Sequence, residues 1–313
     1  MTSQTTDTIM MVRPVHFRYN EQTASNNYFQ EEDKQHSQDQ IQAQAKNEFD
    51  NFVLKLKSCG INVIVVEDNA ESDTPDSVFP NNWVSFHHDG RVGLYPMFAP
   101  NRRVERRQDI LDKLQSKYGF HISRVADFSD YESKDVFLEG TGSMILDRPN
   151  RIAYAALSLR TNKEVLEDFC RQFGYSPVIF VANQTANGKR LPIYHTNVMM
   201  CVAEGFAVIC MDAIDDAAER KSVVDTLERT GKKIIDISEE QQNNFAGNML
   251  QVQSKDDKSY LVMSGAAHKS LRKDQIDVIE KYCSIISSPL DTIEQLGGGS
   301  ARCMMAEVFL PKN

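Results

Sequence analysis

The stretch WVSFHHDGRVGLYPM, residues 83–97, predicts a β-hairpin, because two strand-forming runs flank the turn pair Asp89-Gly90. Two segments rich in β-branched and apolar residues on either side of such a turn favour antiparallel pairing. Three further hairpins and one single strand follow the same plan: GSMILDRPNRIAYAAL (142–157), NVMMCVAEGFAVICM (197–211), NMLQVQSKDDKSYLVMS (248–264) and CMMAEVFLP (303–311).

The spacing of these segments indicates a repeat. The expected first strands begin near Asn82, Gly142, Asn197, Gly247 and Cys303, and subtraction gives intervals of 60, 55, 50 and 56 residues. Regular spacing of roughly 50 residues is typical of supersecondary units arranged radially. An ordinary mixed α/β domain remains the alternative, but tight hairpins argue against a doubly wound parallel sheet.

Helices and strands are expected between the hairpins. The predicted helices span 102–118, 163–173, 215–230 and 269–282, and the predicted strands span 120–125, 177–181 and 233–237. A first helix is expected from about Ser37, which has the spacing of a capping box with Gln40, to Gly60, before a strand at 61–66. The last strand lacks a hairpin partner, and TIMMVRPV (8–15) is expected to supply it and close the structure on itself.

Composition narrows the function classes. The chain has 313 residues, of which 41% are hydrophobic and 25% charged, with a formal net charge of -9. Length alone suggests about two domains with a sizeable core. No basic patch of nucleic-acid type, signal peptide or apolar run long enough for a membrane helix is visible, so neither nucleic acid nor membrane is expected as a partner. The six cysteines are scattered, which predicts reduced thiols in the cytoplasm and no metal site.

Chemically unusual residues occur where the repeated units begin. They are Asn81 and Asn82 before the first hairpin, Glu139 before the second, His195 and Asn197 before the third, and Cys303 at the last strand. In a radial arrangement these positions converge on one pocket. A cysteine, a histidine and a carboxylate form the set that an activated thiolate nucleophile needs.

Each residue also has a simpler interpretation. Cys303 alone is a small buried hydrophobe, His195 a satisfied core histidine, and the asparagines turn residues. Glu139 stands among apolar residues and glycines, where an isolated carboxylate is costly and therefore needs a partner. The run Gly297–Gly299 before Cys303 either allows close backbone approach to a ligand or is a flexible loop. The polar segment 25–30 is either a lid over the pocket or an ordinary surface loop.

At these positions the sequence resembles the guanidino-group-modifying enzymes, the pentein superfamily. The matching segments are FPNNW (79–83), LEGTGS (138–143), YHTN (194–197) and GGGSARC (297–303), with NRRVE (101–105) and SLRTN (158–162) similar to the dimethylarginine hydrolases. The whole chain is most similar to the arginine-deiminase-related branch of citrulline-utilisation hydrolases, often labelled amidinotransferase. The resemblance implies an α/β propeller of five ββαβ units with pseudo-five-fold symmetry, forming one catalytic domain over residues 1–313.

The resemblance also implies roles for residues. Cys303 is expected as the nucleophile, His195 as the general acid and base, and Glu139 as the carboxylate that orients His195 or the substrate. Arg103 and Arg160 match positions that bind the carboxylate of an amino-acid substrate, a task that suits the planar guanidinium. No cofactor is implied, and the oligomeric state is left open, a homo-oligomer included.

Two departures from the superfamily pattern concern the substrate. Its F-x-x-D and His-x-Asp elements supply carboxylates, whereas this chain has Asn82 and Asn197 at those positions. A guanidinium offers only donors, but a neutral ureido group also has a carbonyl acceptor, which an amide can serve. The two asparagines, with Asn81 beside them, therefore favour a ureido substrate such as citrulline, unless a neighbouring carboxylate such as Asp135 restores the charge.

The expected reaction is attack of the Cys303 thiolate on the ureido carbon, with His195 acting first as an imidazolium and then as a base for water. The products would be ornithine, carbon dioxide and ammonia. The alternatives are an arginine or methylarginine deiminase, an amidinotransferase, and a pentein that binds a ligand without turnover.

Overall fold

The computed structural model describes residues 3–186 and 188–312, which form five small three-stranded sheets. In each sheet the first two strands are antiparallel and the third is parallel to the second. The sheets are β3–β4–β5 (Val84–Phe86, Arg91–Leu94, Arg124–Asp127), β6–β7–β8 (Ile145–Asp147, Ile152–Ala156, Ser176–Phe180), β11–β12–β13 (Met200–Val202, Phe206–Ile209, Lys233–Asp236), β14–β15–β16 (Leu250–Gln253, Ser259–Ser264, Ser284–Ser288) and β17–β1–β2 (Ala306–Glu307, Thr8–Arg13, Asn62–Glu67). The prediction of repeated ββαβ units is confirmed.

The fifth sheet joins distant parts of the chain. Strand β1 pairs antiparallel with β17 through Ile9 and Glu307, and parallel with β2 along its whole length. The expected partnership between residues 8–15 and the last strand is therefore confirmed.

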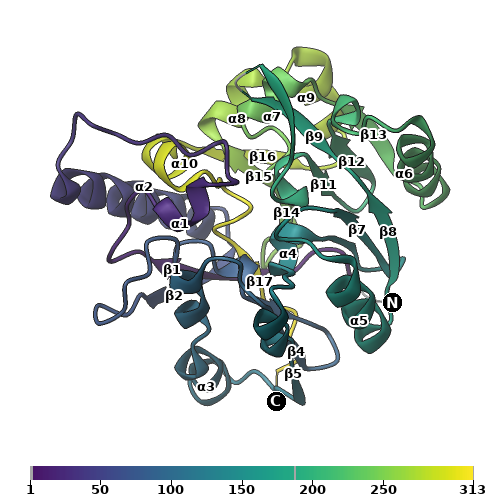
Figure 1. The fold of residues 1–313 in the computed structure, drawn as a ribbon. Helices are drawn as coiled ribbons and strands as arrows, with labels where there is room; N and C mark the ends of the chain where they lie inside the picture. The colour runs from purple at the N-terminus through teal and green to yellow at the C-terminus, as the bar shows by residue number, and fades with distance from the viewer. Residues whose placement is uncertain (1–2, 187, 313) are drawn as a thin grey trace.

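The helices lie around the outside of these sheets (Figure 1). Helix α2 begins after Ser37, whose side chain forms the predicted capping box with Gln40, and its apolar face packs against the fifth sheet. The α-helices are α1 Glu21–Ala24, α2 Gln38–Ser58, α3 Gln108–Ser116, α4 Gly140–Ser143, α5 Lys163–Phe173, α6 Ala217–Arg229, α7 Glu239–Asn243, α8 Gly265–Ser270, α9 Lys273–Ile279 and α10 Asp291–Gly297. Short 3₁₀ helices span Pro80–Asn82 (η1), Pro100–Glu105 (η2), Ser129–Lys134 (η3), Thr196–Val198 (η4) and Met211–Ala213 (η5).

Several predicted boundaries differ from the structure. The expected helix 102–118 is split into η2 and α3, and the expected helix 269–282 is split into α8 and α9. Strand β16, helix α10 and the hairpin β9–β10 (Asn183–Ala186, Lys189–Pro192) have no counterpart in the prediction. The residues expected to open the first three hairpins lie instead in short helical turns, η1, α4 and η4, directly before the strands.

These short turns come together in the middle of the molecule. Helix α4 contacts both η1 and η4, and the first strands β17, β3, β6, β11 and β14 lie beside neighbouring units. Figure 1 shows α4, β14 and β17 near the centre, with α3, α5 and α6 at the rim. The polar residues of the turns therefore meet at one place, as the radial interpretation predicts. In the part of the chain that the structure describes, no helix is both long and apolar enough to cross a bilayer.

Candidate active site

The turns enclose a small polar pocket. It is lined by Asn27, Asp76, Phe79, Asn82, Arg102, Arg160, Tyr194, His195, Gly297, Gly299 and Cys303. The cavity measures about 10 Å³, which is room for about one water molecule. Cys303 and His195 thus share one pocket, together with two of the other predicted site residues, Asn82 and Arg160.

Cys303 is buried, and its sulfur accepts hydrogen bonds from two amide side chains. Asn197 Nδ2 and Asn248 Nδ2 each lie 3.3 Å from Cys303 Sγ. The side chain of Cys303 is 2% exposed. The predicted nucleophile therefore sits in a polar setting within a buried region, although the simplest interpretation of a lone cysteine was an apolar packing residue.

The glycine run before Cys303 is tightly packed. A Cβ atom added at Gly297 or Gly299 would lie within 3.0 Å of the Phe79 ring. Gly298 ends α10 with a φ of 61°, and a Cβ there would meet Asn27 at 2.5 Å. The run is thus packed against pocket side chains and is not a flexible loop, while its close approach to a ligand stays a prediction.

His195 is held by Glu139. Atom Nε2 of His195 lies 2.8 Å from Glu139 Oε2, and the other carboxylate oxygen accepts the N–H of Phe98 at 2.9 Å. An ionised carboxylate only accepts hydrogen bonds, so Nε2 carries the proton and Nδ1 is left as the free nitrogen. The orienting arrangement predicted for this pair is present.

The charges around the pair decide its protonation. Burial works to raise the pKa of Glu139, but Arg160, the hydrogen bond from His195 and Arg102 outweigh it, so this pKa lies well below the usual range. Burial lowers the pKa of His195 to about 4, because the two arginines reinforce burial and Glu139 only partly offsets it. These effects favour the neutral imidazole in the resting pocket, whereas the sequence predicts an imidazolium during attack by sulfur.

Asn82 is fixed in orientation by Arg102. The oxygen of Asn82 accepts a hydrogen bond from Arg102 Nη1 at 2.9 Å. Because a guanidinium only donates, the Asn82 oxygen must face it, and the amide nitrogen points the other way. That nitrogen is buried without a partner, and a Cβ on Gly142 would lie 2.4 Å from it and 2.8 Å from His195 Nδ1. An unused N–H donor therefore lies beside the predicted base.

The other end of the pocket is ionic. Arg160 lies 3.5 Å from Glu139 and donates to Asn26 and to the carbonyl of Thr23, the latter at 2.8 Å. Asp76 accepts from Asn20 at 2.8 Å through one oxygen, while its other oxygen is buried without a partner. Burial raises the pKa of Asp76.

Two predicted site residues, and the one carboxylate named as a possible source of charge, lie differently from expectation. The guanidinium of Arg103 donates to the carbonyls of Met97 and Phe98 at the surface and does not line the pocket, where its neighbour Arg102 is found. Asn81 is buried and contacts Thr141 at 3.3 Å, also outside the pocket lining. Asp135 is exposed, so the carboxylate that enters the pocket beside Asn82 is Asp76 instead.

Sequence reasoning missed Asp76, Arg102 and Asn248. Asn248 stands at the start of the fourth repeated unit, the same position that marked Asn197 in the third, so the repeat itself held the signal. Arg102 lies inside NRRVE, where the resemblance pointed to its neighbour Arg103, and no pattern distinguished Asp76, three residues before FPNN, from a surface charge. Within residues 3–186 and 188–312, no three His, Cys, Asp or Glu side chains are grouped so as to hold a metal ion.

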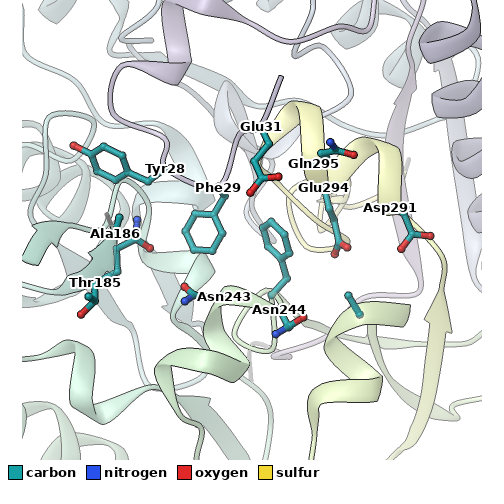
Figure 2. A pocket seen from close by; sticks show the side chains of 13 residues that line it. Tyr28, Phe29, Glu31, Thr185, Ala186, Asn243, Asn244, Asp291, Glu294 and Gln295 are labelled. Atoms are coloured by element: carbon teal, nitrogen blue, oxygen red, sulfur yellow. The ribbon is translucent and has the colours of Figure 1, made fainter. Parts of the chain in front are cut away.

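Residues 20–31 form a covering segment over the pocket. Asn27 donates to the Gly298 carbonyl at 3.3 Å, and Gln30 donates to the Leu296 carbonyl at 2.8 Å. Figure 2 shows the outer side of this segment, where Phe29 projects into a hollow of about 450 Å³ that also borders Asn243 and Glu294. The Phe29 ring packs on Tyr194, whose ring lines the inner pocket. The polar stretch 25–30 therefore separates the inner pocket from the outer hollow.

Comparison with known proteins identifies similar chains. The family model described as N,N dimethylarginine dimethylhydrolase, eukaryotic, matches residues 13–310. No curated protein matches the chain.

Solved structures with the same fold include an arginine dihydrolase of the ornithine-ammonia cycle in Cyanobacteria, ArgZ, at 18% identity and a TM-score of 0.72. The alignment covers 98% of this chain but 41% of ArgZ, so the chain spans less than half of that protein. The N-terminal domain of ArgZ alone, bound to product, aligns at 19% identity over 97% of this chain and 99% of the domain, with a TM-score of 0.70. A dimethylarginine dimethylaminohydrolase aligns at 13% identity, over 98% and 100% of the two chains, with a TM-score of 0.61.

Proposed function

The chain belongs to the N,N dimethylarginine dimethylhydrolase family of the pentein superfamily, cysteine-dependent hydrolases of guanidino compounds, and within it we propose that this protein hydrolyses the ureido group of citrulline or a close derivative. The products would be ornithine, carbon dioxide and ammonia. Guanidino and ureido groups have the same planar carbon, so one nucleophile serves both. The two groups differ in the third atom bound to that carbon, which is a nitrogen in a guanidino group and an oxygen in a ureido group.

The observation that carries the proposal is the unused donor of Asn82. Its oxygen is bound to Arg102, and its buried NH₂ has no partner. A guanidinium also offers only donors, so it would leave this NH₂ unsatisfied and add a second donor against it. A ureido carbonyl would accept the hydrogen bond.

Asn197 fits the same substrate, although its free oxygen would accept from a guanidino group as well. Its NH₂ lies on Cys303 Sγ, and its oxygen is buried without a partner. A ureido NH₂ would donate to that oxygen. The two amides together would thus satisfy a group that has both an acceptor and donors.

The protonation states support one sequence of steps. The neutral His195 accepts the Cys303 proton as sulfur attacks the ureido carbon, and it returns that proton to the departing nitrogen. Loss of ammonia leaves a thiocarbamate on Cys303. His195 then takes a proton from water, which attacks the same carbon and releases the thiol and a carbamate. The carbamate decomposes to ornithine and carbon dioxide, so both stages balance without a redox partner.

The ionic end suits the amino-acid part of the substrate. The free oxygen of Asp76 would accept from an α-ammonium group, and Arg160 would bind the carboxylate. Arg160 is at present occupied by Asn26 and Thr23 of the covering segment. Because the pocket has room for about one water, substrate binding requires this segment to move, which would also release Arg160.

A guanidino substrate is the second candidate. The carboxylates of Glu139 and Asp76 favour it, as do the similar enzymes, which are described as acting on arginine and dimethylarginine. Transfer of the amidino group to an amine instead of water would use the same residues.

The test is a parallel assay with citrulline, arginine and dimethylarginine that records ammonia and identifies the amino-acid product. Ornithine from citrulline, with the guanidino compounds inert, is the expected result. Citrulline from arginine would replace the ureido proposal with a deiminase. Ornithine from arginine would indicate that both reactions occur in succession.

Cys303→Ala separates an enzyme from a ligand-binding pentein. Turnover should fall by about 10⁴-fold or more, since a nucleophile cannot be bypassed, while the thermal melt changes little. Turnover that survives in this variant would overturn the assignment of the nucleophile. Ligand binding without turnover in the unmodified protein would indicate a binding role.

A further inference from the structure

We propose that the outer hollow beside the covering segment is a second binding site, for a small organic cation that carries an ammonium or guanidinium group. Among the described residues that line this hollow, none lines the inner pocket, so the two sites are separate. The volume of about 450 Å³ lies within the range of roughly 300 to 1,000 Å³ that is typical of small-molecule sites. The inference does not depend on the proposed function, because binding needs no turnover.

Three carboxylates line the hollow. They come from Glu31 of the covering segment and from Asp291 and Glu294 of α10, and Figure 2 shows them across the hollow from Asn243 and Asn244. The described lining residues include no Lys, Arg or His. The hollow therefore has an excess of negative charge that a cationic ligand would offset.

Glu294 is the most buried of these carboxylates. Burial raises its pKa to about 7, and the neighbouring carboxylates of Asp291 and Glu48 add to this effect. One Glu294 oxygen accepts a hydrogen bond from Ser300 Oγ at 2.5 Å. A hydroxyl cannot balance the charge of a buried carboxylate, whereas a cation in the hollow would favour its ionised form.

Gln184 gives a second, independent indication of a ligand. Its side chain lines the hollow from strand β9 and is 3% exposed. The amide oxygen Oε1 is buried without a hydrogen-bond partner. An unpaired buried acceptor is costly, and ammonium and guanidinium groups offer only donors, so such a ligand would satisfy it.

Aromatic rings complete the lining. Phe29 and Phe245 lie side by side, with ring centroids 5.1 Å apart, and Tyr28 borders the same hollow. The faces of aromatic rings attract organic cations. Across residues 3–186 and 188–312, no three His, Cys, Asp or Glu side chains are grouped so as to hold a metal ion. The combination of carboxylates, an unpaired acceptor and aromatic rings therefore fits an organic cation better than a metal ion.

The experiment is a calorimetric titration of the full chain with benzylammonium chloride, with benzyl alcohol as the uncharged analogue. A ligand of this size should bind with a dissociation constant on the order of 1 mM, and benzyl alcohol should bind about tenfold more weakly or not at all. Because Glu31 and Asp291 are exposed, Glu31→Gln and Asp291→Asn should each weaken binding of benzylammonium by about threefold, and the double variant by about tenfold. Glu32→Gln removes a charge beside Glu31 but outside the lining and should leave binding unchanged.

Asp76→Asn shows which site the cation occupies, since Asp76 is a carboxylate of the inner pocket. Weaker binding in Asp76→Asn, with unchanged binding in the double variant of Glu31 and Asp291, would place the cation in the inner pocket and overturn the proposal. Equal binding of benzyl alcohol would overturn it too, because the aromatic rings alone would then account for the affinity, and so would the absence of saturable binding. Thermal melts establish that each variant is folded.

Discussion

The two ends of the pocket differ in their buried polar groups, which are mainly charged side chains at one end and amides at the other. At the ionic end, Arg102 donates twice to Glu105 and once to Asn82, and Arg160 is bound by the covering segment. At the amide end, Asn82 and Asn197 each keep one buried atom without a partner. Unsatisfied buried groups are costly, so the unpaired atoms that line the pocket are the ones on which the substrate proposal depends.

The comparison separates residues that hold other site residues in place from residues whose hydrogen-bonding atoms are free to contact a substrate. Arg102 donates to Glu105, to Asn82 and to the carbonyls of Asp76 and Phe79, so it serves to orient Asn82. The amides and the free oxygen of Asp76 have unmet hydrogen bonds and define what the ligand must offer: an acceptor, a donor and a cation.

The largest effect is expected from Glu139→Gln, which removes the negative charge that contacts both His195 and Arg160. The rate constant kcat should fall by about 10³-fold or more, because His195 loses the group that fixes its tautomer. Steady-state kinetics with thermal melts measure this. The matched control is Glu105→Gln, which removes another buried carboxylate that has no contact with His195 and should cost stability more than rate. If kcat of the Glu139→Gln enzyme stays within tenfold of the unmodified value, the charge of Glu139 is not needed for the reaction.

Arg160→Ala and Arg103→Ala test where substrate is bound at the ionic end. Loss of Arg160 should raise KM by about 10- to 100-fold, as expected for lost hydrogen bonds to a charged group. Arg103 lies outside the pocket lining, so its removal should change KM by less than about threefold. Equal effects on KM would mean that Arg103 enters the site when the covering segment opens, as the family resemblance implies.

Asn82→Asp replaces one of the pocket amides with a carboxylate. The new carboxylate can still accept from Arg102 through one oxygen, while the other replaces the unused NH₂. The ratio of kcat/KM for citrulline to that for arginine should fall by about tenfold or more. Asn81→Asp, one residue away and outside the pocket lining, is the control. If this ratio of kcat/KM values does not change, Asn82 does not determine which substrate is used.

The smallest effect concerns pH. The pKa of His195 is lowered from 6.5 to about 4, so between these values the unfolded chain binds a proton that the folded protein does not. The free energy of unfolding contributed by this group is therefore complete above pH 6.5 and is lost as pH falls towards 4. From pH 7 to pH 5 the melting temperature should fall by about 2 °C more in the unmodified protein than in His195→Gln.

His87 provides the matched comparison for that measurement. Burial lowers its pKa well below 6.5 too, but it packs on Phe173 outside the pocket. His87→Gln should reduce the same pH dependence of stability and leave the pH profile of kcat/KM unmoved. If His195→Gln and the unmodified protein melt in parallel at all pH values, His195 is not the neutral imidazole described.

The repeat could be predicted because each unit contains a hairpin, and a hairpin is formed by residues that are close together in the sequence. Turn pairs such as Asp89-Gly90 and strand-forming runs lie next to each other in sequence, so the five units and the closing role of residues 8–15 followed from pattern. Cys303, His195 and Glu139 followed from their equivalent places in those units. The pairing of Cys303 with Asn248 did not, because an asparagine at the start of a strand resembles a turn residue until its neighbours are known.

Arg103 was expected at the pocket from the family resemblance, but its neighbour Arg102 lines it. Pro100–Glu105 forms a 3₁₀ helix, in which adjacent side chains point in different directions, so Arg102 is buried and Arg103 is partly exposed. The resemblance does not show which of two adjacent arginines faces the interior. The strand β16 was missed because SIISS lacks a strong apolar run or hairpin turn, and its pairing to β15 is made by segments joined through α8 and α9.

Because β1 pairs with β17, the fifth sheet can be completed only after β17 has been synthesised. The ribosome releases β1 and β2 long before Cys303 and β17 are made, so the fifth sheet stays incomplete through most of translation. Until then, one edge of β1 is open to pairing with another chain. Cys303 therefore enters its pocket only after the other four units have been synthesised.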